Sequence, residues 1–102
     1  MTVINPQNPP TGTQVTTGAG TLQGVQVPPP AGTTSGSAAI DVSFYDVQWG
    51  LTVTTLTALF ELTPIATVKS ANGYAPIGLN ASYAHGLYAY TRSTSSIAVT
   101  HS

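Results

Sequence analysis

The sequence predicts an all-β protein: a small antiparallel β-sandwich or barrel preceded by a long extended N-terminal arm. Two observations lead to this prediction. Short runs of alternating apolar and polar residues recur over residues 39–102, as in half-buried strands. Residues 1–38 are instead rich in Gly, Pro and Thr, and contain no charged or aromatic side chain. We therefore expect two parts, an arm over residues 1–38 and a compact β-domain over residues 39–102.

The arm has too few apolar side chains to offset its own ordering, which costs about 1–2 kcal/mol per residue for the backbone alone. Val25 and Val27 alternate with glutamine and could add a strand to a neighbouring sheet. Pro28, Pro29 and Pro30 follow directly and favour an extended polyproline II conformation. The segment is therefore either an arm that becomes ordered on another subunit or a flexible linker.

The β-domain opens with a clear strand, since Ile40, Val42 and Phe44 share one face. The alternation slips at Tyr45-Asp46, where we expect a bulge or tight turn. A second alternating run follows, and it places Trp49 in the core by default. The apolar members of this run are Val47, Trp49, Leu51 and Val53.

Residues 55–62 allow two interpretations. The alternation of Leu56, Ala58, Phe60 and Leu62, together with the β-branched threonines, favours a strand. The spacing of Leu59 and Leu62 also fits one stripe of a helix. The sequence leaves strand and helix open for Thr55–Leu62, and Pro64 ends either element.

The last forty residues continue the pattern of short strands separated by turns. Asn72-Gly73 is a strong hairpin signal between two such runs. The runs are "IATVKS", "LNASYAHG", "LYAYTR" and "IAVTH". Seven or eight strands spaced in this way are typical of an antiparallel sandwich or small barrel.

Charge is scarce, and this excludes several kinds of partner. Asp, Glu, Lys and Arg make up 5% of the chain, against roughly 25% in a usual soluble domain. Lys69 and Arg92 are the only cations, so we expect neither nucleic-acid binding nor a polybasic membrane anchor. A small core without cysteine is expected to need oligomerisation, and a surface so poor in charge is expected to be covered.

No motif in the sequence indicates a reaction. The two histidines and three carboxylates have no metal-ligand spacing, and no glycine-rich phosphate loop is present. A triad of Ser82, His85 and Asp46 can be assembled on paper, but no nucleophile elbow surrounds any serine. We expect no enzyme, no cofactor and no metal.

One group of aromatic residues could form a binding surface. Tyr83, Tyr88 and Tyr90 combine apolar rings with polar tips, and tyrosine is enriched where proteins meet other proteins. The alternatives are that these rings pack in the sandwich with their hydroxyls at its margin, or that they stack on sugars.

The layout resembles the capsid decoration, or cement, proteins of tailed bacteriophages. The resemblance is carried by the arm "TGTQVTTGAGTLQGVQVPPPAGTTSG" followed by a compact β-rich part without cysteine. It implies a homotrimer on the outer capsid surface of the virion, produced in the host cytoplasm. The arm would bind the neighbouring major capsid protein, with Val25 and Val27 as anchors and the three prolines holding it away from the domain. The shell would thereby be stabilised.

Two other functions remain open. The chain could be another structural subunit of a virion or filament, such as a tail, fibre or coat protein. It could also be a sugar-binding β-module with a linker, in which Tyr88 and Tyr90 contact the glycan.

Overall fold

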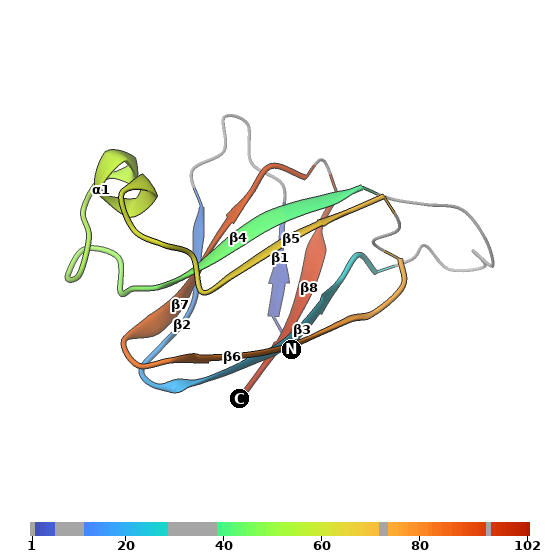
Figure 1. The fold of residues 1–102 in the computed structure, drawn as a ribbon, viewed down its shortest axis with the longest axis horizontal. Helices are drawn as coiled ribbons and strands as arrows, with labels where there is room; N and C mark the ends of the chain where they lie inside the picture. The colour runs from blue at the N-terminus through green and yellow to red at the C-terminus, as the bar shows by residue number, and fades with distance from the viewer. Residues whose placement is uncertain (1, 6–11, 29–38, 72–73, 94) are drawn as a thin grey trace.

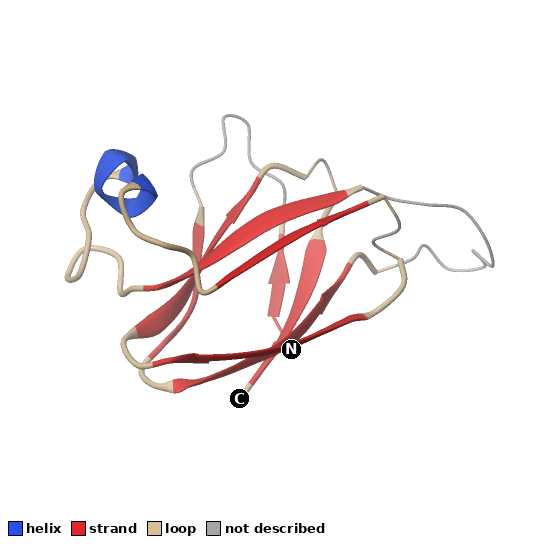
Figure 2. Ribbon diagram, in the orientation of Figure 1, coloured by secondary structure: helices blue, strands red, loops and turns tan. Residues whose placement is uncertain are grey.

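The computed structural model describes residues 2–5, 12–28, 39–71, 74–93 and 95–102, and within them the chain forms strands and one short helix (Figures 1 and 2). The elements are β1 (Thr2–Ile4), β2 (Thr13–Thr17), β3 (Gly20–Gln26), β4 (Ile40–Asp46), α1 (Leu56–Phe60), β5 (Ala66–Ser70), β6 (Ile77–Tyr83), β7 (Gly86–Thr91) and β8 (Ile97–His101).

The strands form two four-stranded antiparallel sheets. Sheet A has the order β1-β8-β3-β6, and sheet B has the order β2-β7-β4-β5. In chain order, the first strand pairs with the last, the second with the seventh, the third with the sixth and the fourth with the fifth. A long eight-stranded hairpin rolled into two sheets gives this pairing, which is the jelly-roll arrangement. The predicted antiparallel sandwich is confirmed.

The main core lies between the sheets and draws on both. On β4, Ile40, Val42 and Phe44 are at most 1% exposed, as their alternation predicts. They pack with side chains of sheet A such as Leu22 and Val99, which are fully buried. Burying each such side chain stabilises the fold by about 1.5–3 kcal/mol. The core therefore depends on contacts between strands that are distant in the sequence.

The described part of the predicted arm belongs to this sandwich, which corrects the expectation for those residues. Its three strands pair with strands from the C-terminal part, and β3 lies inside sheet A between β8 and β6. Val25 and Val27 are 3% and 4% exposed in the main core, so they cannot anchor the chain to another subunit. Pro28 is exposed, whereas Pro29 and Pro30 lie outside the described residues.

The hairpin expected at Asn72-Gly73 is also corrected. Those two residues lie outside the described part of the chain, but the strands on either side of them are described. β5 is at the edge of sheet B and β6 at the edge of sheet A, so the two strands do not pair. The rolled topology explains this, because it sends most consecutive strands to opposite sheets.

Candidate interaction surface

The segment between β4 and β5 leaves the sandwich and returns to it, and we call residues 47–65 the lobe. Figure 1 shows the lobe with α1 at one end of sheet B, apart from the strands. The expected strand over residues 47–53 is reduced to an isolated bridge between Trp49 and Val53. The main chain turns sharply between them at Gly50, whose φ is 87°. Glycine adopts such a conformation without a Cβ clash.

Residues 55–62 contain a helix, so the strand that the alternation favoured is wrong and the competing interpretation is confirmed. Thr55 is the N-cap, because its Oγ1 accepts a hydrogen bond of 3.1 Å from the backbone N of Ala58. Such a cap typically stabilises a helix by about 1 kcal/mol. The helix turns Leu59 inward, where it is fully buried. Tertiary burial and the cap together outweigh the β-propensity of the threonines.

Beneath the lobe lies a second core on the outer face of sheet B. It consists of the buried residues Tyr45, Val47, Val53, Leu59 and Tyr88, with Leu56, Ala58 and Tyr90 packed against them. Sheet B is thus covered on its inner face by sheet A and, at one end of its outer face, by the lobe. The phase slip at Tyr45-Asp46 corresponds to the end of β4 and the start of the lobe.

Aromatic residues of β7 connect the sheet to the lobe. The ring of Trp49 stacks on that of Tyr88, with centroids 5.0 Å apart and planes 14° apart. Phe60 meets Tyr90 edge-on at 4.9 Å, and the Arg92 guanidinium lies 4.9 Å from the Tyr90 ring centre. Each such aromatic pair contributes about 0.5–1.5 kcal/mol beyond burial. These contacts make the lobe a defined surface rather than a loose loop.

Large apolar side chains are exposed on the lobe, among exposed threonines. Five large hydrophobic side chains are exposed among the described residues, and only Val3 lies outside the lobe. The other four are Trp49, Leu51, Phe60 and Leu62, with exposed fractions of 36%, 77%, 48% and 41%. Glu61 is the one charged residue of the lobe. Clustered exposed apolar side chains mark interaction sites more often than scattered ones do.

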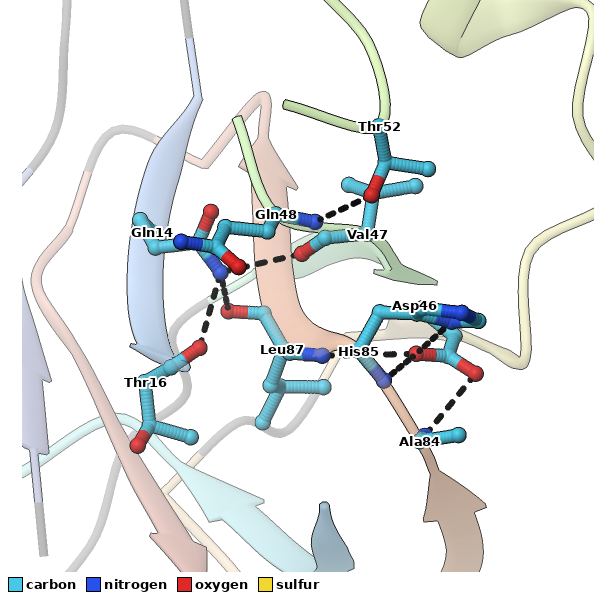
Figure 3. Close-up of polar contacts among 10 residues, drawn as sticks. Gln14, Thr16, Asp46, Val47, Gln48, Thr52, Ala84, His85 and Leu87 are labelled. Atoms are coloured by element: carbon cyan, nitrogen blue, oxygen red, sulfur yellow. Dashed lines mark hydrogen bonds and ion pairs between the residues drawn. The ribbon is translucent and has the colours of Figure 1, made fainter. Parts of the chain in front are cut away.

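A glutamine fixes the base of the lobe to β2 (Figure 3). The Gln14 Nε2 group donates to the carbonyls of Thr16, Val47 and Leu87 at 2.8, 3.0 and 3.1 Å. Its Oε1 accepts a bond of 2.7 Å from the backbone N of Trp49. The β2–β7 register shifts between Gln14 and Thr16, so the side chain supplies partners where the ladder is interrupted.

A carboxylate fixes the turn beside this base, as Figure 3 also shows. The backbone N–H groups of Ala84, His85 and Gly86 donate to Asp46 at 3.0, 2.8 and 3.4 Å. Partial burial acts to raise the pKa of Asp46, but these donors and the nearby His85 outweigh it and hold the pKa below its ordinary value. The Nδ1 of His85 lies 3.5 Å from Oδ1 of Asp46. This carboxylate is engaged in holding the β6–β7 turn.

The three tyrosines expected to share a surface do not do so. Tyr83 is 3% exposed in the main core, and its hydroxyl donates to the carbonyl of Ser102 at 3.0 Å. Tyr88 is 5% exposed beneath Trp49, and burial raises its pKa. Tyr90 is half-buried under Phe60 and Arg92. The accessible aromatic surface is therefore made by Trp49 and Phe60, which cover the rings of Tyr88 and Tyr90.

The opposite end of the outer face of sheet B carries most of the charge. Lys69 and Asp41 are directly opposed on β5 and β4, and Arg92 lies 3.3 Å from Asp41. A pocket of about 440 Å³ opens beside them, lined also by Ser93. Ser93 Oγ accepts a bond of 2.7 Å from the backbone N of Asp41. Exposed ion pairs contribute little to the free energy of unfolding. We therefore interpret these contacts as fixing the register of β4 against its neighbours.

In the described part of the chain, no group of three His, Cys, Asp or Glu side chains could hold a metal ion. The Asp46 carboxylate next to His85 is already occupied by three backbone donors. These hydrogen bonds hold the β6–β7 turn in place.

The sequence missed the exposure of the lobe because alternation placed Trp49 and Leu51 in a strand. The signal that could have revealed the lobe is local. Thr55 stands three residues before Ala58 and opens a short Leu-rich segment, as an N-cap does.

Two further observations bear on this surface. No helix among the described residues is long and apolar enough to cross a membrane. In comparisons with protein-family models, curated proteins and solved structures, no match to this chain was found.

Proposed function

We propose that the protein is a structural virion subunit, a capsid decoration or cement protein, and that it binds the shell through the lobe. The observation that carries the proposal is the set of four exposed hydrophobic side chains on the lobe. Binding would bury these side chains against the major capsid protein or another virion subunit and so stabilise the outer surface of the shell.

The chemistry of the lobe supports a protein partner. Trp, Tyr and Phe are enriched at protein interfaces, and charged residues are depleted at their cores. The lobe has Trp49 and Phe60 at its surface, with Glu61 as its only charged residue. A chain with 5% charged residues also lacks the charge repulsion that keeps proteins apart. These properties suit permanent assembly.

The topology is compatible with this role. Jelly rolls occur in viral capsid proteins, and also in lectins and cupins. Fold alone does not determine function, so the proposal depends on the lobe and on the resemblance to decoration proteins in size, in the lack of cysteine and in the Gly-, Thr- and Pro-rich N-terminal sequence. A trimer is the form that this resemblance implies.

The proposed mechanism differs from the one the arm suggested. Because Val25 and Val27 belong to the core, the lobe takes over the contact first assigned to them. Any contact by residues 29–38 would be an addition to it. Deleting residues 1–38 would not test the contribution of an arm, since it would remove β1, β2 and β3.

The test compares two exposed aliphatic positions. Leu51→Asp places a charge on the lobe, and Val3→Asp places one on β1 of sheet A, where Val3 is 52% exposed. Each protein is sedimented with DNA-free shells assembled from the cognate major capsid protein. We expect the wild type and V3D to co-sediment and L51D to bind at least tenfold more weakly, which corresponds to roughly 1.4 kcal/mol.

Two results would contradict the proposal. Equal binding of L51D and wild type would remove the lobe from the contact. A wild-type protein that binds no shell, or that forms filaments when concentrated, would favour a tail, fibre or coat subunit instead.

A second candidate is a sugar-binding module, and one observation favours it. The partly exposed Trp49 ring borders a hollow of about 350 Å³, lined also by Gly12, Gln14 and Tyr88. Aromatic rings exposed in this way can stack on a sugar. Binding to a glycan array that is lost in Trp49→Ala but kept in Leu51→Asp would favour this function over shell binding.

A further inference from the structure

Lys69 and Arg92, the two cations of the chain, line one pocket at the charged end of sheet B. Lys69 belongs to β5, whereas Arg92 directly follows β7. Asp41 also lines the pocket, on β4, which lies between β5 and β7 in the sheet. The volume of about 440 Å³ falls within the range of about 300–1,000 Å³ that is usual for small-ligand sites. The fold therefore brings both cations to a cavity that is large enough for a small ligand.

The charged side chains of this pocket carry an excess of one positive charge, because Asp41 balances only one of the two cations. The chain as a whole has a net charge of −1. Its other two carboxylates lie elsewhere: Asp46 accepts hydrogen bonds in the β6–β7 turn, and Glu61 belongs to the lobe. All charged side chains of the sequence are among the described residues, so the chain has no further side-chain carboxylate to place beside the two cations.

Arg92 is held in place and still has donors to spare. Its backbone N donates to the Asp41 carbonyl at 2.8 Å, and its Nη1 lies 3.3 Å from Oδ1 of Asp41. Its guanidinium also lies 4.9 Å from the Tyr90 ring centre. A guanidinium has five N–H donors, and within the described residues only Nη1 is used.

Lys69 is directly opposite Asp41 in the β4–β5 ladder, but the Asp41 carboxylate pairs with Arg92. Among the described residues, the ammonium of Lys69 takes part in no ion pair. Strand register accounts for the contact between Arg92 and Asp41, but it gives the Lys69 ammonium no partner. An anion in the pocket would provide one.

We propose that this pocket binds a carboxylate that carries an apolar body, with Lys69 and Arg92 donating to its oxygens. One excess positive charge matches a monoanion. A phosphate group carries about −1.5 to −2 charges at pH 7 and would bring the additional charge next to Asp41. Ala39 and Ala71 also line the pocket, and together with the alkyl part of Lys69 they offer contacts for the apolar body.

This inference goes beyond the proposed function and does not rest on it. The pocket and the lobe occupy opposite ends of the outer face of sheet B, and they share no residue. Leu51→Asp, which should abolish shell binding, should bind the carboxylate as the wild type does. The two proposals can therefore fail separately.

The test titrates the full chain with sodium butyrate and follows its backbone amide signals by nuclear magnetic resonance. The neutral isostere butyramide and inorganic phosphate are titrated in parallel at equal ionic strength. We expect butyrate to shift the signals of Ala71 and Ser93, which line the pocket, with saturation in the millimolar range that suits so small a ligand. Butyramide should bind at least tenfold more weakly, and phosphate more weakly than butyrate.

Substitution of Lys69 tests the residue that strand register leaves without a partner. Lys69→Gln should weaken butyrate binding at least tenfold, whereas Lys69→Arg keeps the charge and should retain binding. Val3→Asp changes the net charge by the same amount as K69Q, but on β1 of sheet A, and should bind butyrate as the wild type does. Unchanged amide signals from the main core would show that K69Q is folded.

Three results would overturn the inference. The first is equal binding of butyrate and butyramide by the wild type, which requires no variant to fold. The second is equal butyrate binding by K69Q and wild type, which would leave Lys69 only the protection of an edge strand. The third is phosphate binding as tight as that of butyrate, which would make the pocket an unselective anion site.

The carboxylate could belong to a free organic acid or to the end of a peptide chain. N-acetyl-trialanine and its C-terminal amide distinguish these sources. If the peptide acid binds more tightly than butyrate and its amide does not bind, the result supports a chain terminus as the ligand. Tighter binding of butyrate supports a free acid.

Discussion

Replacing Leu59 by alanine should test whether the lobe is held in place by the second core. Leu59 is fully buried and is the only buried residue of α1. It packs with Tyr45, Val47 and Tyr88 on the outer face of sheet B. Its truncation therefore removes the central contact between the helix and the sheet, without touching the main core between the sheets.

The expected decrease in the free energy of unfolding can be worked out from the burial of the Leu59 side chain. Leu→Ala removes three carbon atoms, and burial of each contributes about 0.8 kcal/mol, which gives roughly 2.4 kcal/mol before any cavity remains. Buried Leu→Ala changes span about 2–5 kcal/mol. Because α1 has only five residues and can settle toward the sheet, we expect about 2.5–3.5 kcal/mol.

Urea unfolding provides the assay, and the single tryptophan makes it local. Trp49 stacks on Tyr88 at the edge of the second core, so its fluorescence reports the lobe, while far-ultraviolet circular dichroism reports the sheets. The matched variants are Leu59→Met, which conserves volume and should lose less than about 1.5 kcal/mol, and Phe60→Ala. Phe60 is 48% exposed, so it should lose about 1 kcal/mol.

The reasoning would be refuted if L59A lost less than about 1 kcal/mol, or if F60A lost more than L59A. Either result would mean that the outward rather than the inward face of α1 holds the lobe.

Three further changes probe the supports of the lobe by urea unfolding. Asp46→Asn should lower the free energy of unfolding by about 1–2 kcal/mol at pH 7, because an amide replaces a carboxylate that accepts hydrogen bonds from three N–H groups. The pKa of Asp46 is lowered in the folded state, so its carboxylate stabilises the fold above the ordinary aspartate pKa. That stabilisation is lost as the pH falls through the lowered value. The difference in the free energy of unfolding between D46N and the wild type should therefore shrink below about pH 4. Gly12→Ala should lower the free energy of unfolding by about 1–3 kcal/mol more than Gly18→Ala does. Both glycines have φ near 85°, but only at Gly12 would a Cβ lie 2.5 Å from Tyr88. Gln14→Glu should be less stable than Gln14→Ala at pH 7, because its carboxylate would face three carbonyl oxygens.

Each of these expectations can fail separately. A difference for D46N that is independent of pH would contradict the account of the carboxylate. Equal losses at the two glycines would show that Tyr88 moves aside without cost, and a Q14E variant as stable as Q14A would show that the bonds to the carbonyls contribute little.

The sequence predicted those parts of the fold that depend on local alternation. β4 is the clearest case, since Ile40, Val42 and Phe44 face the core as their spacing indicates. β1 and β2 were missed, and β3 was expected to pair with a neighbouring sheet rather than with its own chain, because the stability of these strands comes from partners far along the chain. Thr2 pairs with Val99, and no composition of residues 1–38 can show that.

The site was harder to predict for a related reason. Alternation in residues 47–62 is equally consistent with a strand and with a loop that covers a sheet, because both bury every second or third residue. The hydrogen bonds of Gln14 to Val47 and Trp49 decide between them, and they join residues 33 and 35 positions apart. Tyr88 and Tyr90 were correctly noted as aromatic residues of one strand, but which rings cover them depends on the lobe.

The pairing of the first strand with the last has a consequence for how the chain acquires its structure. During synthesis β1, β2 and β3 emerge long before β8, β7 and β6, which are their hydrogen-bonding partners. Closing such long loops slows folding, and topologies of this kind fold in milliseconds to seconds. A ribosome-bound nascent chain would therefore hold its early strands unpaired until β6, β7 and β8 leave the exit tunnel, which makes the partly synthesised polypeptide a natural client for holdase chaperones.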